Sequence, residues 1–371
     1  MPPPYDHLHV YYGDLHNHCN VGYAHGSLAD AYHNARLQLD FLCVTVHGHW
    51  HDIPDSEARL SDLVDYHKKG FARAAAAWDQ VKEMARLHHR DGAFVTFLGH
   101  EWHSNRYGDH NIYFKGVEGD IIRAADMEEM RATLRTYGEQ GIETMLIPHH
   151  IGYKAGYRGI NWSEFDPEFI SVVEIMSMHG ASESAAAPYS YLHTMGPRDW
   201  QSTLQHGLAQ GHVVGVVGST DHHSAHPGSY GHGKVGLWAE ALTRDGIWHA
   251  IRSRRTYALT GDRIQLEFSL NDDLMGSVVP ASAERRIQVA VDGGDAIDYI
   301  EVLHNNHVFH RWNPEPTDPG DVYRNPLKVY LELGWGDRGE NVDWQAALQV
   351  VDGKLRTVEP RFRGHEVVAP Q

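Results

Sequence analysis

Histidine and acidic residues occur in short clusters along the first two-thirds of the chain, and the first cluster contains His16 and His18. Residues i and i+2 of an extended strand point to the same face, so these two imidazoles can reach one point. Imidazole is a good ligand for zinc, manganese and iron near neutral pH. Similar clusters follow at residues 47–51, 100–103, 149–150 and 221–223, and together they predict a metal site.

The candidate ligands combine neutral nitrogens with carboxylate oxygens, and they lack the thiolates of a structural zinc site. The candidate nitrogen ligands are His16, His18, His25, His47, His110, His149 and His223, and the candidate oxygen ligands are Glu101 and Asp221. In the last cluster Asp221 and His223 share one face of an extended segment, whereas His222 points away. We expect Glu101, Asp221 and His223 to take part directly in catalysis.

The elements that must position these residues are short apolar runs alternating with helical patterns. The runs that end in His, Asp or Glu lie at residues 41–46, 93–98, 144–147 and 213–217, and residues 169–176 carry Glu174. Alternation of strand and helix predicts a parallel sheet, either open or closed into a barrel. In α/β barrels the active site lies at the carboxyl ends of the strands, so the clusters are expected to converge there.

The pattern changes near Gly261, where alternating strand-like runs replace helical periodicity. We therefore predict two domains. Residues 1–261 are expected to form the metal-binding catalytic barrel, and residues 262–371 a small all-β, sandwich-like appendage.

The composition narrows the range of partners. The chain has 32 basic and 49 acidic side chains, a formal charge of −17, which argues against nucleic-acid or anionic-membrane partners. Two cysteines among 371 residues fit a reducing, cytoplasmic location. No signal peptide or membrane span is expected. The predicted partner is a small-molecule substrate, and a homo-oligomer is possible.

The order of the clusters resembles the PHP (polymerase and histidinol phosphatase) family of metal-dependent phosphoesterases, in its larger bacterial form with a β appendage. The matching motifs are Asp14-Leu15-His16-Asn17-His18, Val44-Thr45-Val46-His47, Gly99-His100-Glu101 with His110 nine residues on, Pro148-His149-His150, and Gly218-Ser219-Thr220-Asp221-His222-His223. The resemblance covers residues 10–260 and implies a distorted (β/α)7, TIM-like barrel with two or three divalent ions. It places Glu101 between two ions and assigns the loop ligand after the first motif to His25.

The second motif departs from the family pattern, and the resemblance does not assign the residues that bind substrate. Val46 stands where the family has an acid, which removes a carboxylate that would orient His47. His149 is favoured over His150 as the ligand of the fourth motif. Four residues near strand ends are candidates for substrate binding: Lys154, Arg158, His150 and Glu174.

Three functions remain open at this stage. The favoured one is a phosphatase or phosphodiesterase that uses a metal-bound hydroxide in a di- or trinuclear manganese, zinc or iron site on a small phosphorylated metabolite. The second is a metal-dependent hydrolase of a C–N or C–O bond in an amide, lactone or ester, which a pocket without a cationic group would favour. The third is a non-catalytic metal-bound interaction module.

Overall fold

The computed structural model describes residues 4–191, 197–314, 328–329, 331, 333, 344–351 and 353–364. The helices are α1 (Leu28–Arg36), α2 (Ser61–Ala76), α3 (Trp78–His88), α4 (Met127–Glu139), α5 (Leu204–Ala209) and α6 (Arg244–Arg252). The strands up to residue 261 are β1 (His9–Asp14), β2 (Phe41–Trp50), β3 (Val95–His103), β4 (His110–Phe114), β5 (Thr144–Pro148), β6 (Val172–Ser177), β7 (Gly180–Ala181), β8 (Gly215–Gly218), β9 (Lys234–Ala239) and β10 (Thr256–Leu259). Among the described residues no helix has the length and apolar character needed to cross a membrane.

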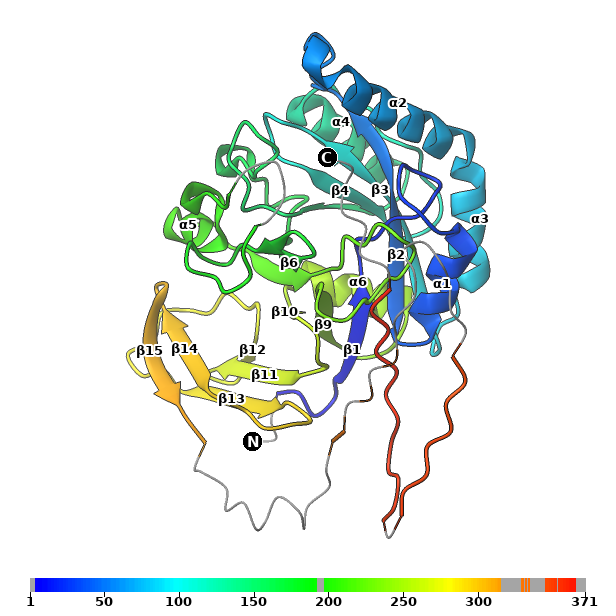
Figure 1. Cartoon of the computed structure of the whole chain (residues 1–371). Helices are drawn as coiled ribbons and strands as arrows, with labels where there is room; N and C mark the ends of the chain where they lie inside the picture. The colour runs from blue at the N-terminus through cyan, green and yellow to red at the C-terminus, as the bar shows by residue number, and fades with distance from the viewer. Residues whose placement is uncertain are drawn as a thin grey trace.

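A curled seven-stranded sheet in the order β10-β9-β1-β2-β3-β4-β5 dominates the molecule (Figure 1). A three-stranded sheet, β7-β6-β8, follows it: a parallel bridge joins Leu146 of β5 to Ile170. At the other edge the Thr256 hydroxyl of β10 donates to the Val216 carbonyl of β8 at 2.8 Å.

The prediction of an all-parallel sheet is wrong in part. The pairs β1–β2, β2–β3 and β6–β8 are parallel, but β4, β9 and β10 pair with their neighbours in antiparallel fashion. No helix separates β3 from β4, so the chain returns through a short loop, and a short return produces an antiparallel pair. The architecture is mixed α/β.

Side chains of the curled sheet alternate between two apolar cores. Phe41, Cys43, Val95 and Phe97 belong to an inner core that α6 also joins, whereas Leu98 belongs to an outer core beneath the helices. Because strand side chains alternate with a period of two, the inward positions run on along β2 and β3 toward their carboxyl ends. The polar residues at those ends therefore line the interior.

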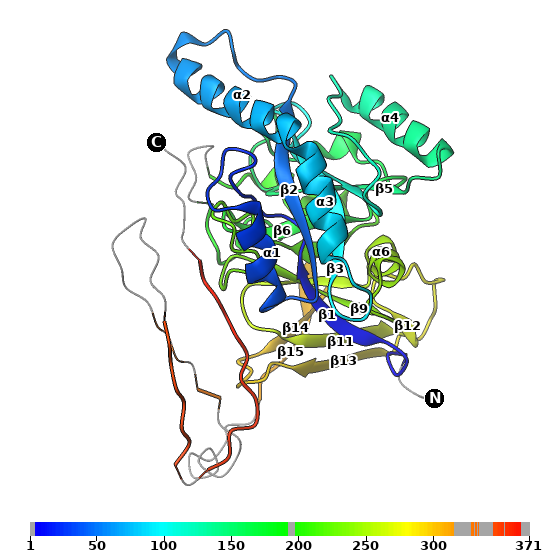
Figure 2. The same cartoon turned by 90° about the vertical axis from the view of Figure 1, so that its right-hand side faces the viewer.

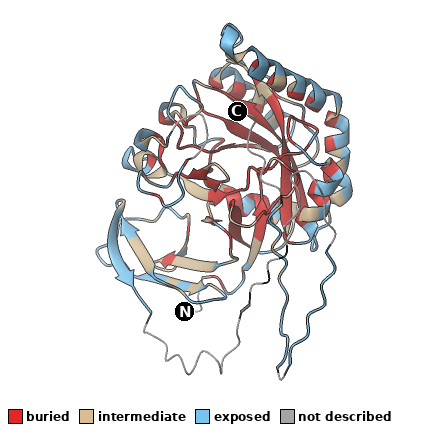
Figure 3. Ribbon diagram, in the orientation of Figure 1, coloured by how far each residue is buried: buried red, intermediate tan, exposed pale blue. Residues whose placement is uncertain are grey.

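Helices cover the outer face of the sheet. Figures 1 and 2 show α1, α2 and α3 along the outer side of β2 and β3, and Figure 3 shows that the strands beneath them are buried. Helix α1 has a defined start: Ser27 is its N-cap and forms a capping box with Asp30.

Beyond Gly261 the described chain forms two small antiparallel units. These are a sheet in the order β12-β11-β13, made of β11 (Gln265–Leu270), β12 (Asp273–Leu274) and β13 (Ile287–Asp292), and a hairpin of β14 (Ile300–His304) and β15 (His307–Trp312). Residues 346–351, which belong to the part predicted as all-β, have no strand pairing. Phe268 and Met275 pack with Tyr5 and Trp238, so β11 shares a core with the first and ninth strands.

Candidate metal centre

Two segments more than 200 residues apart hold the site together. A parallel bridge pairs Asn17 with His222, and the Asp221 N–H donates to the His16 carbonyl at 2.7 Å. The buried Asp14 carboxylate accepts four hydrogen bonds: from Thr220 N at 3.1 Å, Thr220 Oγ1 at 2.5 Å, Gly228 N at 2.9 Å and His16 N at 3.1 Å. The end of β1 and the loop after β8 are thereby fixed side by side.

His16, His18, Asp221 and Glu101 form the centre of the cluster. The Nε2 atoms of His16 and His18 lie 3.1 Å apart, and they are 3.2 and 2.9 Å from Asp221 Oδ1. Glu101 Oε2 lies 3.4 Å from His18 Nε2. All four side chains are buried, so nitrogens and oxygens converge on a common space away from solvent.

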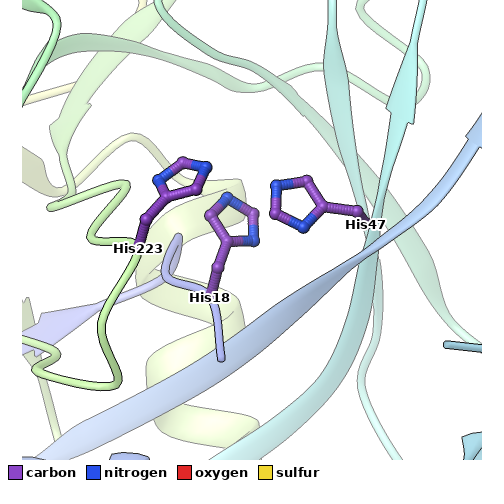
Figure 4. Close-up of side chains that lie close together, drawn as sticks. All are labelled: His18, His47 and His223. Carbon is purple, nitrogen blue, oxygen red and sulfur yellow. The ribbon is translucent and has the colours of Figure 1, made fainter. Parts of the chain in front are cut away.

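His47 and His223 lie on either side of His18 (Figure 4). The His18 and His47 rings are stacked with centroids 3.8 Å apart, and the His223 centroid is 4.5 Å from that of His18. His223 Nδ1 donates to the Asp221 carbonyl at 2.8 Å, which leaves Nε2 available for a ligand. The His223 side chain is 20% exposed, so it lies on the open side of the cluster.

A third group lies on the other side of Glu101. Its Oε1 atom is 3.2 Å from His149 Nε2, and Asp109 Oδ2 is 3.4 Å from His150 Nε2. Arg158 enters this group: its Nε donates to Asp109 Oδ2 at 2.6 Å, and its Nη2 lies 3.7 Å from Glu101 Oε1.

Glu174, predicted as a substrate-binding residue, contacts two histidines of the cluster. Glu174 Oε2 lies 2.9 Å from His16 Nδ1, and Oε1 accepts the His150 N–H at 3.3 Å. Burial raises the pKa of Glu174 to about 7. The contact with Nδ1 of His16 leaves its Nε2 directed at Asp221 and His18.

Seven of the nine predicted ligands come together, and two do not. His25 is exposed and belongs to no metal-capable group among the described residues. His110 is buried but faces outward: its Nδ1 donates to the Gly108 carbonyl at 2.8 Å, and its ring packs near Trp102. Strand alternation explains the error, because Tyr113 of β4 faces the inner core and positions 111 and 109 share its face.

Of the other three substrate-binding candidates, two lie in the cluster and one does not. His150 and Arg158 lie in the cluster, whereas Lys154 is exposed, with its Nζ 5.9 Å from the Tyr157 ring centroid. We therefore place Lys154 outside the site.

Four residues that the sequence reading did not assign to the site also reach it. These are Asp109, His103, His179 and Tyr23. His103 follows Glu101 by two positions on β3, a spacing that could have identified it, and its Nδ1 lies 3.0 Å from Glu101 Oε1. His179 Nε2 lies 2.8 Å from Asp221 Oδ2. Tyr23 stacks on His47, and nothing in its sequence context signals that contact.

The charge states of the cluster suit cation binding. Burial lowers the pKa of His149 to about 4 and that of His223 to about 3, so both are neutral and able to coordinate. Burial opposes ionisation of Glu101, but His103 and His149 outweigh it and hold its pKa well below the usual value. Burial acts to lower the pKa of His16, but the carboxylates of Asp221 and Glu174 raise it well above its usual value. The same carboxylates would attract a cation.

The donor set fits divalent cations. The described residues contain five groups of three or four side chains whose potential ligand atoms lie within 4.8 Å of one another. Glu101 Oε2 and His149 Nε2 are buried and make no hydrogen bond within the described part of the chain. Buried polar atoms without partners are costly, and a bound cation would satisfy both.

Fold and site define a mixed α/β protein with a buried histidine–carboxylate cluster suited to metal ions. Residues 229–296 match the family described as Protein of unknown function (DUF3604). Uncharacterized proteins of Chlamydia pneumoniae and Chlamydia trachomatis serovar D are each 28% identical, over 43% and 42% of this chain. Each match spans 28% of the relative's length.

Three solved structures have some similarity of fold to this chain. A two-domain protein from Bacteroides vulgatus containing a predicted PHP-like metal-dependent phosphoesterase has a TM-score of 0.45 at 14% identity, covering 85% of this chain and 97% of its own. Endonuclease Q in complex with a 27-mer duplex bearing an abasic lesion has a TM-score of 0.39 at 14% identity, covering 66% and 57%. A lesion-specific endonuclease from Pyrococcus furiosus has a TM-score of 0.36 at 14% identity, covering 66% and 56%.

One prediction about partners is wrong. The sequence argument excluded nucleic acid because of the charge of −17, but the Endonuclease Q structure contains a duplex substrate. Net charge averages over the whole surface, and bound divalent cations are not counted in it. The net charge of this chain is therefore no ground for excluding a nucleic-acid substrate.

Proposed function

We propose that this protein is a metal-dependent hydrolase of phosphoric esters, acting as a phosphatase or phosphodiesterase. In this proposal residues 1–261 form the catalytic unit, a distorted β/α barrel of PHP type, and residues 262–371 are an appended β-rich part. The favoured substrate is a small phosphorylated metabolite, and the favoured ions are two or three of manganese, zinc or iron.

The observation that carries the proposal is the position of Arg158 beside the histidine–carboxylate cluster. The cluster supplies ligands for cations, and the guanidinium lies 3.7 Å from Glu101 on its border. A fixed positive charge beside a metal site suits an anionic substrate such as a phosphoryl group. A pocket without such a group would have favoured an amide, lactone or ester.

The roles of the residues follow from their positions. Divalent cations held by these residues would polarise a phosphoryl group and would make a nucleophile available at neutral pH. Glu101 and Asp221 stay ionised and hold the cations, with His16, His18 and His47 completing the set. His223 lies on the open side with Nε2 free of the Asp221 carbonyl, so it is placed to contact substrate or a cation there.

Metal analysis and turnover together test the proposal. The purified protein should contain divalent metal and hydrolyse p-nitrophenyl phosphate or bis-p-nitrophenyl phosphate with Mn²⁺, Zn²⁺ or Fe²⁺. A 27-mer duplex with an abasic site should be assayed in parallel, since the net charge is no ground for excluding a nucleic-acid substrate. Fewer than two ions per chain, together with no turnover of any of the three substrates, would contradict the proposal.

Two histidine variants, one in strand β2 and one in the loop after β1, provide a matched comparison. His47→Ala removes a buried side chain stacked between Tyr23 and His18, and we expect it to lower bound metal and to reduce turnover at least about 100-fold. His25→Ala removes an exposed side chain and should leave both unchanged. Metal content by mass spectrometry and initial rates measure the difference, and loss of metal in the His25 variant would contradict the site described here.

A further inference from the structure

The group formed by Glu101, Asp109, His149 and His150 has the composition of a metal site, yet a cationic side chain already lies in it. Arg158 Nε and Nη2 both contact Asp109 Oδ2, with Nε at 2.6 Å. Nη2 lies 2.6 Å from His103 Nδ1 and 3.7 Å from Glu101 Oε1. The guanidinium therefore contacts both carboxylates of this group, which an ion in this position would also need.

The backbone of Arg158 is held in an uncommon conformation that places its guanidinium in this group. Its φ angle is +69°, a left-handed conformation that residues with a β-carbon rarely adopt. The Arg158 N–H donates to the Asn105 carbonyl at 3.3 Å, and the Asp109 N–H donates to the Arg158 carbonyl at 3.4 Å. The arginine and its carboxylate partner are thus tied together through both main chain and side chain. Uncommon backbone conformations of this kind concentrate at functional positions.

The imidazole that would complete a third ion site points elsewhere. The resemblance in sequence assigns a ligand to His110, but that ring is committed to the Gly108 carbonyl in the outer layer. Its place on the inner face of the strand is taken by Asp109, whose carboxylate is paired with Arg158. A nitrogen ligand is lost from this position and a fixed positive charge is gained.

The loss of a nitrogen ligand and the gain of a positive charge both disfavour binding of a third cation. A guanidinium stays protonated at every pH that a folded protein tolerates, so it repels a cation bound to the same carboxylates. It also neutralises part of the negative charge of Glu101 and Asp109, which a third ion would otherwise do.

We propose that Arg158 takes the place of a third cation, so that this protein holds two divalent ions, not three. The two ions are bound by residues drawn from His16, His18, His47, Glu101, Asp221 and His223. This inference rests on the proposed function, because it presumes that the cluster binds divalent cations. Arg158 then supplies a positive charge on the side of Glu101 away from His47.

The number of bound ions tests this inference without reference to turnover. Full-length protein is stripped with a chelator, reloaded with excess Mn²⁺ or, separately, Zn²⁺, desalted, and analysed for metal per chain by mass spectrometry. We expect two equivalents. Three equivalents in the wild type overturn this inference but leave the proposed hydrolase intact, whereas none or one argues against the metal site itself and hence against both.

Substitutions separate charge from position. Arg158→Gln removes the positive charge and should raise the count to three equivalents, because Glu101, Asp109, His149 and His150 are then free of it. Arg158→Lys keeps a positive charge and should hold two. Arg106→Gln removes an exposed arginine from the loop between β3 and β4 and should also hold two.

A count of two in Arg158→Gln, with a melting temperature close to that of the wild type, would overturn the idea that the guanidinium excludes an ion. If that variant does not fold, the wild-type and Arg158→Lys counts decide. Two equivalents in both support the inference, and three in either contradict it.

Discussion

At the scale of single residues, a few side chains determine whether the ligands meet. The clearest is Asp14, which lies between the two ligand-bearing segments but contacts no other member of the cluster through its carboxylate except the His16 backbone. Its four hydrogen bonds join the end of the first strand to Thr220 and Gly228. A residue of this kind belongs to a motif in the sequence, yet its role is visible only in three dimensions.

We predict that Asp14→Ala lowers the free energy of unfolding by roughly 3 kcal/mol, because it leaves three buried N–H groups without an acceptor. The same change should reduce bound metal, since Asp221 is no longer held beside His16. Urea denaturation and metal analysis measure the two effects. As a control, Asp30→Ala disturbs only the exposed cap of α1 and should cost about 1 kcal/mol with metal content unchanged. An Asp14 variant as stable as the wild type would show that the four bonds do not matter.

At the scale of strands and helices, the sequence predicted many of the strands but not whether each pair of neighbours is parallel or antiparallel. Apolar runs at residues 41–46, 93–98 and 144–147 became β2, β3 and β5, each followed by site residues. The antiparallel pairing of β4 could not be predicted, because pairing direction depends on loop length and tertiary context, which apolar runs do not encode. His110 was misplaced for a related reason: a motif gives the residue, and only the strand register gives its face.

Lys234 of β9 offers a prediction at this scale. Burial lowers the pKa of its ammonium group from 10.5 to about 8. Below pH 8 the ammonium group is charged in both states, but it is buried in the folded state and solvated in the unfolded chain. Between pH 8 and 10.5 the unfolded state binds more protons, so this group makes stability rise with pH. A shift of this size corresponds to roughly 3 kcal/mol.

We therefore expect Lys234→Met to be more stable than the wild type at pH 7, by up to roughly 3 kcal/mol. The difference should shrink as the pH rises from 8 to 10.5. Denaturant titrations of both proteins at pH 7, 8.5 and 10 measure it, and other titrating groups cancel in the comparison. A difference that stays constant with pH would contradict the assignment to Lys234.

At the scale of the whole molecule, the β-rich part is attached by a shared core and by several hydrogen bonds, of which the Tyr5 hydroxyl makes three. Tyr5 donates to the Phe268 carbonyl at 2.7 Å, and its oxygen accepts the N–H groups of Met275 at 3.2 Å and Phe268 at 3.4 Å. The sequence predicts a boundary near Gly261 because helical periodicity gives way there to short strand-like runs. It gave no sign that the start of the chain packs against the strand that follows the boundary, because such contacts depend on side chains far apart in sequence.

Tyr5→Phe should lower the free energy of unfolding by about 2 kcal/mol, because it leaves the Met275 N–H and the Phe268 carbonyl without their partner. Metal content and turnover should not change, since the site is remote from this contact. Tyr157→Phe is the matched control: that ring is 62% exposed and its change should be within about 0.5 kcal/mol of the wild type. Equal losses in the two variants would mean that Tyr5 does not fasten the β-rich part.

The bridge between Asn17 and His222 has a consequence for synthesis on the ribosome. The first pair of imidazoles emerges early, but the carboxylate that completes their surroundings is made some 200 residues later. The full set of candidate ligands therefore exists only after translation has passed residue 223, and until then His16 and His18 form only a partial set.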